Sequence, residues 1–189
     1  MKHLNAKQQG FTLIEVVIVT FLFSILLLGL MSLYDWHQKV YMLEQAEVQA
    51  TGSVRSAMNN MSRYIAQGRE IDSSRTINGT TYNTSSSSII VEIPSLSASG
   101  DVVNGGFDYV VYYLSGTNLY QVIETGSGSV RIGGTKQLSS AMESLTFTYN
   151  NADPTIASQV IIDMQARATA RGTSSVTAHV IDTIFLRNR

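Results

Sequence analysis

The most constraining feature of this 189-residue sequence is an apolar run that extends from Phe11 to Tyr34. It is long enough to cross a bilayer as a helix, since about 20 apolar residues span the hydrocarbon core. The run contains one charged side chain, Glu15, near its start. A lone carboxylate in hydrocarbon costs at least ~2.5 kcal/mol by insertion scales, and such groups usually have a partner or a task. Glu15 therefore predicts a specific cation close by.

A short polar leader, residues 1–10, precedes the run and ends in Gly10. A cut between Gly10 and Phe11 would create a new α-amine four residues before Glu15. The amine and the carboxylate could then neutralise each other, either within one chain or between neighbouring subunits. Pairing between subunits would set the register of an assembly.

The N-terminal segment resembles the class III signal of type IV pilins and of the pseudopilins of type II secretion. Gly, Phe, Thr, Leu, Ile and Glu follow one another from Gly10 to Glu15 in the order found in that family. The resemblance implies that a membrane-embedded prepilin peptidase cuts after Gly10 and methylates the new N-terminal Phe11. It also implies that Glu15, the fifth residue of the cleaved chain, supports incorporation of the subunit into a filament.

An ordinary secretory signal and a plain membrane anchor each account for less of this segment. A secretory signal has a shorter apolar core with its cleavage site after that core, whereas the site here precedes a long core. A single-span anchor fits the length and hydropathy but accounts for neither Glu15 nor the Gly10–Phe11 junction. Lys2 and Lys7 precede the span and few positive charges follow it closely. We therefore expect a cytoplasmic leader, a span in the inner membrane and a periplasmic or extracellular globular part.

Composition limits the remainder to one domain of ordinary size in addition to the anchor. Without the leader's Lys2 and Lys7, the 13 Lys and Arg fall to 11 against 14 Asp and Glu. This balance does not favour a nucleic-acid partner. The sequence contains no cysteine, which excludes disulfides and thiolate metal sites, so stability must come from packing.

Apolar residues continue beyond the run at the three- and four-residue spacing of an amphipathic helix, with no proline among them. They are Trp36, Val40, Leu43, Ala46, Ala50, Val54, Ala57, Met61 and Ile65. We expect one helix from Phe11 to about Gln67. Residues 11–34 would be its membrane-spanning or filament-core half, and residues 35–68 its amphipathic half, packed on a β domain. Gly68 is expected to end the helix, because glycine tolerates the left-handed conformation that is common there.

The polar stretch 69–88 is expected to be an exposed linker loop with a turn at Asn78-Gly79. Residues 89–189 are rich in Val, Ile, Tyr, Thr and Phe, as half-buried strands prefer. The expected strands are 89–93, which stops at Pro94, and then 107–114, 119–124, 145–149, 160–168 and 176–185. Hairpin turns are expected at 115–118 and near 171–173. Short connections favour antiparallel pairing, so the predicted fold class is α+β.

The β region carries a second resemblance. A tyrosine-containing hairpin followed by the segment Met142–Tyr149, and a final strand ending near Arg187-Asn188, are similar to the W-type minor pilins and the J-type pseudopilins. The resemblance implies a pilin-like fold, with one long N-terminal helix packed on a C-terminal antiparallel β domain. It favours a minor subunit over a major one.

The sequence offers no pattern for catalysis, a cofactor or a metal. His37 follows the span and His179 falls in an expected strand, so the chain beyond the leader has no His pair at metal-ligating spacing, and both are expected at the surface. No serine lies in a Gly-x-Ser-x-Gly elbow. The aspartates, including Asp108, are too dispersed for a calcium loop. We expect a protein that is not an enzyme and has no cofactor.

Four arginines, Arg167, Arg171, Arg187 and Arg189, could cluster at one end of the C-terminal hairpin. Solvated charges at strand ends are the simpler interpretation. The functional alternative is a subunit contact or a DNA-binding patch, whose affinity would fall steeply with salt.

The predicted function is a minor pilin of a type IV pilus, processed by prepilin peptidase and drawn from the inner membrane into a filament. Its partners would be other pilin or pseudopilin subunits and the assembly platform. A minor pseudopilin of a type II secretion system is the first alternative, because no single residue separates the two. A DNA- or surface-binding subunit at a filament tip is the second.

Overall fold

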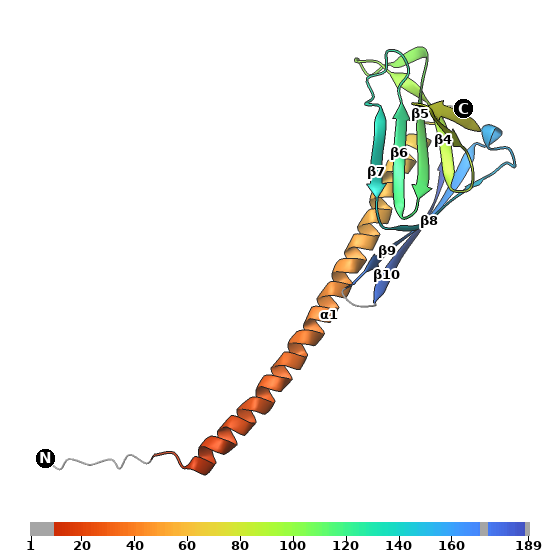
Figure 1. Cartoon of the computed structure of the whole chain (residues 1–189). Coiled ribbons are helices and arrows are strands. Elements are labelled where there is room, and N and C mark those ends of the chain that lie inside the picture. The colour runs from red at the N-terminus through yellow and green to blue at the C-terminus, as the bar shows by residue number, and fades with distance from the viewer. Residues whose placement is uncertain (1–9, 171–173, 188–189) are drawn as a thin grey trace. The chain divides into compact units, whose positions relative to one another are not determined.

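The computed structural model describes residues 10–170 and 174–187 (Figure 1). Its elements in chain order are α1 (Leu13–Ile65), β1 (Glu70–Ile71), β2 (Ser74–Ile77), β3 (Thr80–Asn83), β4 (Ser88–Leu96), β5 (Val102–Ser115), β6 (Asn118–Glu124), β7 (Gly134–Ser139), β8 (Met142–Tyr149), the 3₁₀ turn η1 (Pro154–Ile156), β9 (Gln159–Thr169) and β10 (Ser175–Phe185). Two compact units make up the chain, Met1–Met42 and Leu43–Arg189.

In the first unit, α1 is exposed on all sides through Tyr34, and near its N-terminus it is long and apolar enough to cross a membrane. The helix starts and ends within two residues of the predicted Phe11 and Gln67, so the prediction of one uninterrupted helix is confirmed. The leader before Gly10 lies outside the described residues. The boundary predicted at residue 34 depends on a membrane and stays a prediction.

In the second unit, the amphipathic stripe of α1 is buried from Ala46 onwards. The buried residues are Ala46, Ala50, Val54, Ala57, Met58, Met61 and Ile65. Their three- and four-residue spacing places them on one helix face. The stripe was expected to begin at Trp36, but Trp36 is 62% and Leu43 37% exposed. Only the later part of the stripe, from Ala46 to Ile65, is therefore buried in the core of this chain.

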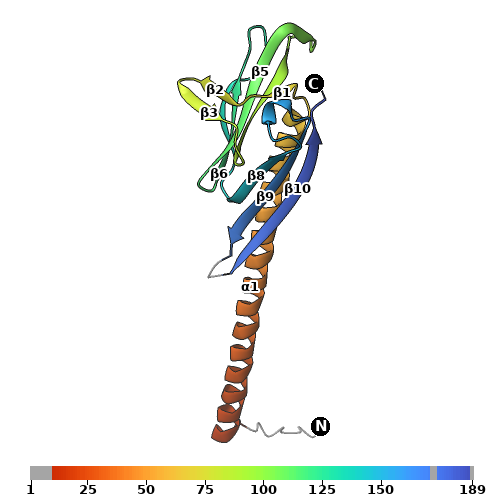
Figure 2. The same ribbon diagram turned by 90° about the vertical axis from the view of Figure 1, so that its right-hand side faces the viewer.

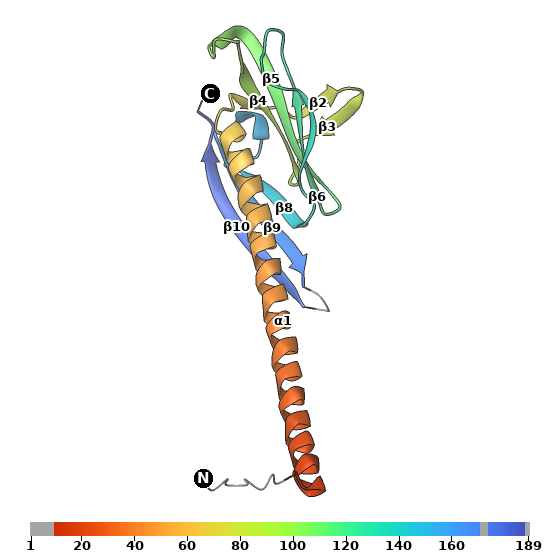
Figure 3. The same ribbon diagram turned by 90° about the vertical axis from the view of Figure 1, so that its left-hand side faces the viewer.

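The strands form two main antiparallel sheets and a separate hairpin. The five-stranded sheet has the order β1-β4-β5-β6-β7, the three-stranded sheet has the order β10-β9-β8, and β2 pairs with β3. Figures 2 and 3 show β9 and β10 alongside the later turns of α1. One buried cluster joins Met61 and Ile65 of α1 to Ile93 of β4, Tyr112 of β5 and Met164 of β9. The α+β pilin-like fold is confirmed.

The stretch 69–88 is not the exposed loop that its polar composition predicted, because it contains β1, β2 and β3. Ile71 pairs with Val91 and is fully buried. Ile77 is buried in a second apolar cluster, beneath the β2–β3 hairpin that Figure 2 shows beside the five-stranded sheet. Two isoleucines therefore supply enough apolar contact to order a polar segment. The predicted Asn78-Gly79 turn is confirmed, with positive φ at both residues.

Pro94 does not end β4 as expected. The strand continues to Leu96, and Pro94 lies opposite Phe107 just before the register with β5 shifts. A proline is tolerated in a strand at such an irregularity, because the ladder there is already interrupted. Strand β7 was not predicted, since most of its residues are exposed and show no apolar alternation.

Gly68 follows α1 for a different reason than the one predicted. It is buried, and its φ is not positive. A Cβ at this position would lie 2.7 Å from Val91 Cγ1 and 3.2 Å from Leu186 Cδ2. Glycine is required here because the sheet approaches the helix end closely.

Replacing Gly68 with alanine should lower the free energy of unfolding by about 1–3 kcal/mol, because the added methyl group overpacks the contact with Val91. Chemical denaturation of the full-length protein in detergent, followed by circular dichroism, measures the change. Gly52→Ala is the matched control, since Gly52 is a helical glycine with open space around its Cβ position. That variant should be up to about 1 kcal/mol more stable. Equal effects in both variants would contradict a steric role for Gly68.

Candidate functional site

The predicted processing site lies at the very start of α1. Gly10 has open space around its Cβ position, and Phe11 is 79% exposed. Thr12 caps the helix: its carbonyl accepts from the Glu15 N–H at 3.1 Å and from the Val16 N–H at 3.2 Å, and its hydroxyl lies 3.4 Å from the Glu15 nitrogen. Thr12 and Glu15 have the spacing of a capping box. Glu15 thus lies in the first turn, where the helix dipole favours a carboxylate.

The other polar side chains of the apolar half have their hydrogen bonds within the helix itself. Thr20, Ser24 and Ser32 each donate to a backbone carbonyl one turn earlier, at 2.8–3.0 Å. Among the residues that the structure describes, Glu15 makes no ion pair. Glu15 is therefore the polar group in this half of α1 for which we expect a cationic partner from outside the described residues.

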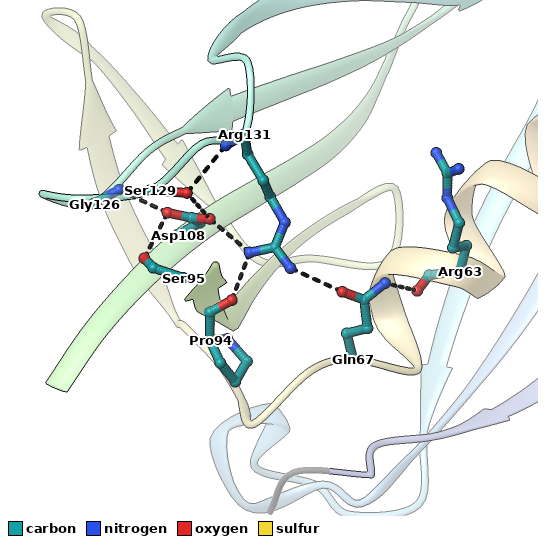
Figure 4. A network of polar contacts seen from close by, with 8 residues as sticks. All are labelled: Arg63, Gln67, Pro94, Ser95, Asp108, Gly126, Ser129 and Arg131. Carbon is teal, nitrogen blue, oxygen red and sulfur yellow. Dashed lines mark hydrogen bonds and ion pairs between the residues drawn. The ribbon is translucent and has the colours of Figure 1, made fainter. Parts of the chain in front are cut away.

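The second notable site is a buried carboxylate in the second unit. Asp108 of β5 is completely buried, and its Oδ2 lies 2.6 Å from Arg131 Nη1 (Figure 4). Oδ1 accepts from the Ser95 hydroxyl at 2.7 Å and from the Gly126 N–H at 2.7 Å. Oδ2 also accepts from the Ser129 hydroxyl at 2.8 Å. Both oxygens of Asp108 are thus fully hydrogen-bonded.

Arg131 extends this network to the end of the helix. It donates to the Pro94 carbonyl and, through Nη2, to Gln67 Oε1 at 2.9 Å (Figure 4). Gln67, just beyond α1, donates in turn to the Arg63 carbonyl at 2.8 Å. The network therefore fastens the 125–134 segment, strands β4 and β5 and the last turn of α1 to one another.

Burial by itself would raise the pKa of Asp108. The hydrogen bonds from Arg131, Ser95, Gly126 and Ser129 outweigh that effect, and the pKa is lowered from its ordinary value. The side chain is therefore ionised at neutral pH. This site holds the fold together and offers no open face to a substrate.

The sequence marks Asp108 only as one of several dispersed aspartates and does not single out Arg131. A signal was present, because Asp108 shares the period-two face of β5 with the buried Val110 and Tyr112. A carboxylate on a buried face requires a cation or several donors. What the sequence does not indicate is which distant arginine supplies the charge.

The alternative of an arginine cluster is contradicted for the two members that the structure describes. Arg167 of β9 lies opposite Thr177 of β10, and Arg187 lies ten residues further along the chain. Ten extended residues span about 33 Å. Arg167 is exposed and pairs with Glu143 at 3.3 Å. The antiparallel hairpin thus carries Arg167 and Arg187 to opposite ends, while Arg171 and Arg189 lie outside the described residues.

The histidines lie as predicted, at the surface. His37 is exposed, and His179 of β10 is exposed with Nε2 2.7 Å from Asp163 Oδ1. Within residues 10–170 and 174–187, no group of three or more His, Cys, Asp or Glu side chains could hold a metal ion.

Comparison with protein families gives a match over residues 5–31, to the prokaryotic N-terminal methylation motif. The matched motif includes the start of the apolar helix, which precedes the antiparallel β domain. The match supports membership of the type IV pilin and pseudopilin family and does not specify a minor-pilin subtype. It points to a structural subunit. A comparison with curated proteins finds no match.

Acid should destabilise the protein through Asp108. Because its folded pKa is lowered, the stabilisation is fully present above the unfolded value of about 3.9 and is lost as pH falls through the folded value. Asp108→Asn should cost about 3–5 kcal/mol at neutral pH, since it leaves Arg131 unpaired. Unfolding free energies measured from pH 7 to pH 2 should fall less steeply at acidic pH in this variant.

Asp101→Asn serves as the control for that series, because Asp101 is exposed. The double variant Asp108→Asn/Arg131→Met should recover part of the loss, as neither charge is then buried alone. An unchanged acid slope in Asp108→Asn would contradict the assignment.

Proposed function

We propose that this protein is a minor pilin of a type IV pilus, which prepilin peptidase cuts after Gly10 and which then leaves the inner membrane for a filament. The observation that carries the proposal is the Glu15 carboxylate, which has no ion pair within the described chain and lies in the first turn of an apolar helix whose other polar groups are internally bonded. It lies inside the matched methylation motif.

The proposed mechanism is assembly. Cleavage frees the α-amine of Phe11, and N-methylation leaves that amine positively charged. The amine would pair with Glu15 of its own chain or of a neighbouring subunit. A helix that leaves lipid for a bundle of apolar helices loses little hydrophobic stabilisation, so close packing and the neutralisation of Glu15 would supply the specificity.

The charge distribution supports the proposed orientation in the membrane. Lys2 and Lys7 precede the span and would hold the leader in the cytoplasm. The β domain would then be periplasmic, and exposed on the filament after assembly. Prepilin peptidase, other pilins and the assembly platform are the proposed partners.

A minor pseudopilin of type II secretion remains the second candidate, because the matched motif is common to both classes. A deletion separates them: loss of pili, twitching or DNA uptake indicates a pilin, and retained exoproteins indicate a pseudopilin. The separation of Arg167 from Arg187 gives no support to a DNA-binding patch at one end of the hairpin.

Glu15→Gln should block filament entry, because the neutral amide no longer pairs with the terminal amine. The lost charged hydrogen bond is of the order of 1.5–3 kcal/mol, so the filament fraction should fall at least about tenfold. Immunoblots of sheared filaments and of membranes measure the two pools. Glu44→Gln is the control, since Glu44 is an exposed acid on the later part of α1. Normal filament entry by Glu15→Gln would overturn the mechanism.

A further inference from the structure

Strand β10 lies at the border of the three-stranded sheet. All of its 11 residues pair with β9 in one continuous register. In the part of the chain that the structure describes, no strand pairs with its other edge. Figure 3 shows β10 as the outermost strand on its side of the sheet. β10 therefore presents a long row of backbone groups along its outer side.

The hydrogen bonds at the end of β10 show which residues form that row. The Leu186 N–H donates to the Ser158 carbonyl at 3.0 Å, on the β9 side. Because backbone groups alternate along a strand, even-numbered residues face β9 and odd-numbered residues face outwards. The Arg187 N–H agrees, since it donates to the Ala66 carbonyl beyond the helix, at 3.2 Å. The outward N–H and C=O groups are those of Thr177, His179, Ile181, Thr183 and Phe185. Among them, the Thr183 N–H already donates to Asp182 Oδ1 at 2.8 Å.

This edge has few of the features that protect exposed strands. Natural edges are interrupted by lysine, proline or bulges, which prevent another strand from adding to them. β10 has no lysine, proline or glycine, and its register with β9 shows no shift. Its one acid, Asp182, is turned to the α1 side, where it accepts from the Ser62 hydroxyl at 3.1 Å. Ile181 and Phe185 are 58% and 62% exposed.

A hollow of about 660 Å³ opens at the C-terminal end of the same edge. Its lining includes Arg63 from the last turns of α1, and Asp182, Thr183, Phe185 and Arg187 from the end of the hairpin. The side chains of Thr183 and Phe185 project from the strand face opposite to that of Asp182. The hollow therefore adjoins the free edge at this end of β10. An incoming strand would therefore run directly into it.

The hollow is complementary to a negative charge. Among the described residues, neither Arg63 nor Arg187 forms an ion pair. The Arg63 guanidinium lies over the Tyr64 ring, 5.0 Å from its centroid, which leaves its N–H groups available. The Asp182 carboxylate already accepts from Ser62 and from the Thr183 N–H. Two arginines thus face one carboxylate that is already hydrogen-bonded.

We propose that the free edge of β10 binds an extended segment of a different polypeptide as an added strand, and that Arg63 and Arg187 bind a carboxylate at the end of that segment. Backbone pairing would supply the affinity, and the two arginines would fix the register and the end of the strand. A second copy of β10 fits less well, because its one acid is in mid-strand and turned towards its own helix. A small free anion would leave the edge unpaired.

Binding of a synthetic peptide to the full-length protein in detergent micelles tests the proposal. The probe is a short fluorescein-labelled peptide of alternating threonine and valine that ends in aspartate with a free carboxylate. We expect saturable binding. The affinity should fall about tenfold or more when the peptide ends in an asparagine amide, because a charged hydrogen bond to the arginines is then lost. Arg63→Gln/Arg187→Gln should produce the same loss and bind both peptides equally.

Ile181→Pro tests the strand pairing, because it removes an outward N–H and no N–H that β9 uses. It should reduce binding by about tenfold, whereas Ile181→Val, which keeps the N–H, should bind as the wild type does. Hydrogen exchange on the wild type gives a readout that needs no variant: the peptide should slow exchange of the His179 and Ile181 amides. Absence of saturable binding, equal binding by a folded Ile181→Pro, or unchanged exchange at these amides would overturn the proposal.

Discussion

The structure depends on one constraint: the first half of α1 carries large apolar side chains on every face, and the described part of this chain does not cover them. Leu13 and Leu28, for example, are 84% and 66% exposed. Burial of one such side chain contributes about 1.5–3 kcal/mol, so their sum strongly disfavours exposure to water. We therefore expect an apolar environment around this segment, either lipid or the apolar helices of other subunits. The apolar side chains of this segment are accommodated about equally well in lipid and in a bundle of apolar helices. The Glu15 carboxylate distinguishes the two environments, because a neighbouring subunit can offer it a cation.

The second half of the same helix meets the opposite requirement, because it must pack on its own β domain. Alanines at 46, 50 and 57 allow close approach, and Gly68 lets the sheet reach the helix end without a clash. Asp108 and Arg131 then fasten the segment beyond α1 to the five-stranded sheet. Burying two charges costs desolvation free energy, which is offset here because both carboxylate oxygens are saturated with donors. The helix end is thereby held in one geometry.

Much of the architecture could be predicted because it follows from short-range patterns. The apolar run and the three- and four-residue spacing after it predicted α1 to within two residues at each end. The Asn-Gly dipeptide predicted the turn at Asn78-Gly79, where both residues have positive φ. The segment 69–88 was missed because Ile71 and Ile77 gain their burial from strands distant in the sequence. The Pro94 irregularity and the exposed strand β7 likewise have no local apolar signature.

The candidate sites divide in the same way. Gly10, Phe11 and Glu15 are close together in the sequence, so their pattern can be recognised from the sequence alone. Asp108 and Arg131 are 23 residues apart, and only the sheet brings them together. The arginine cluster considered as an alternative is not formed by Arg167 and Arg187, because the antiparallel hairpin places them at opposite ends. Their nearness in the sequence does not reveal this separation.

The central claim is that cleavage before Phe11 supplies the cation that Glu15 requires. Mass spectrometry of the N-terminal peptide of the native protein, isolated from filaments and from membranes, tests it most directly. The account predicts that the filament form begins at Phe11 and carries one N-methyl group. A native protein that still begins at Met1 and is found in no filament would contradict it.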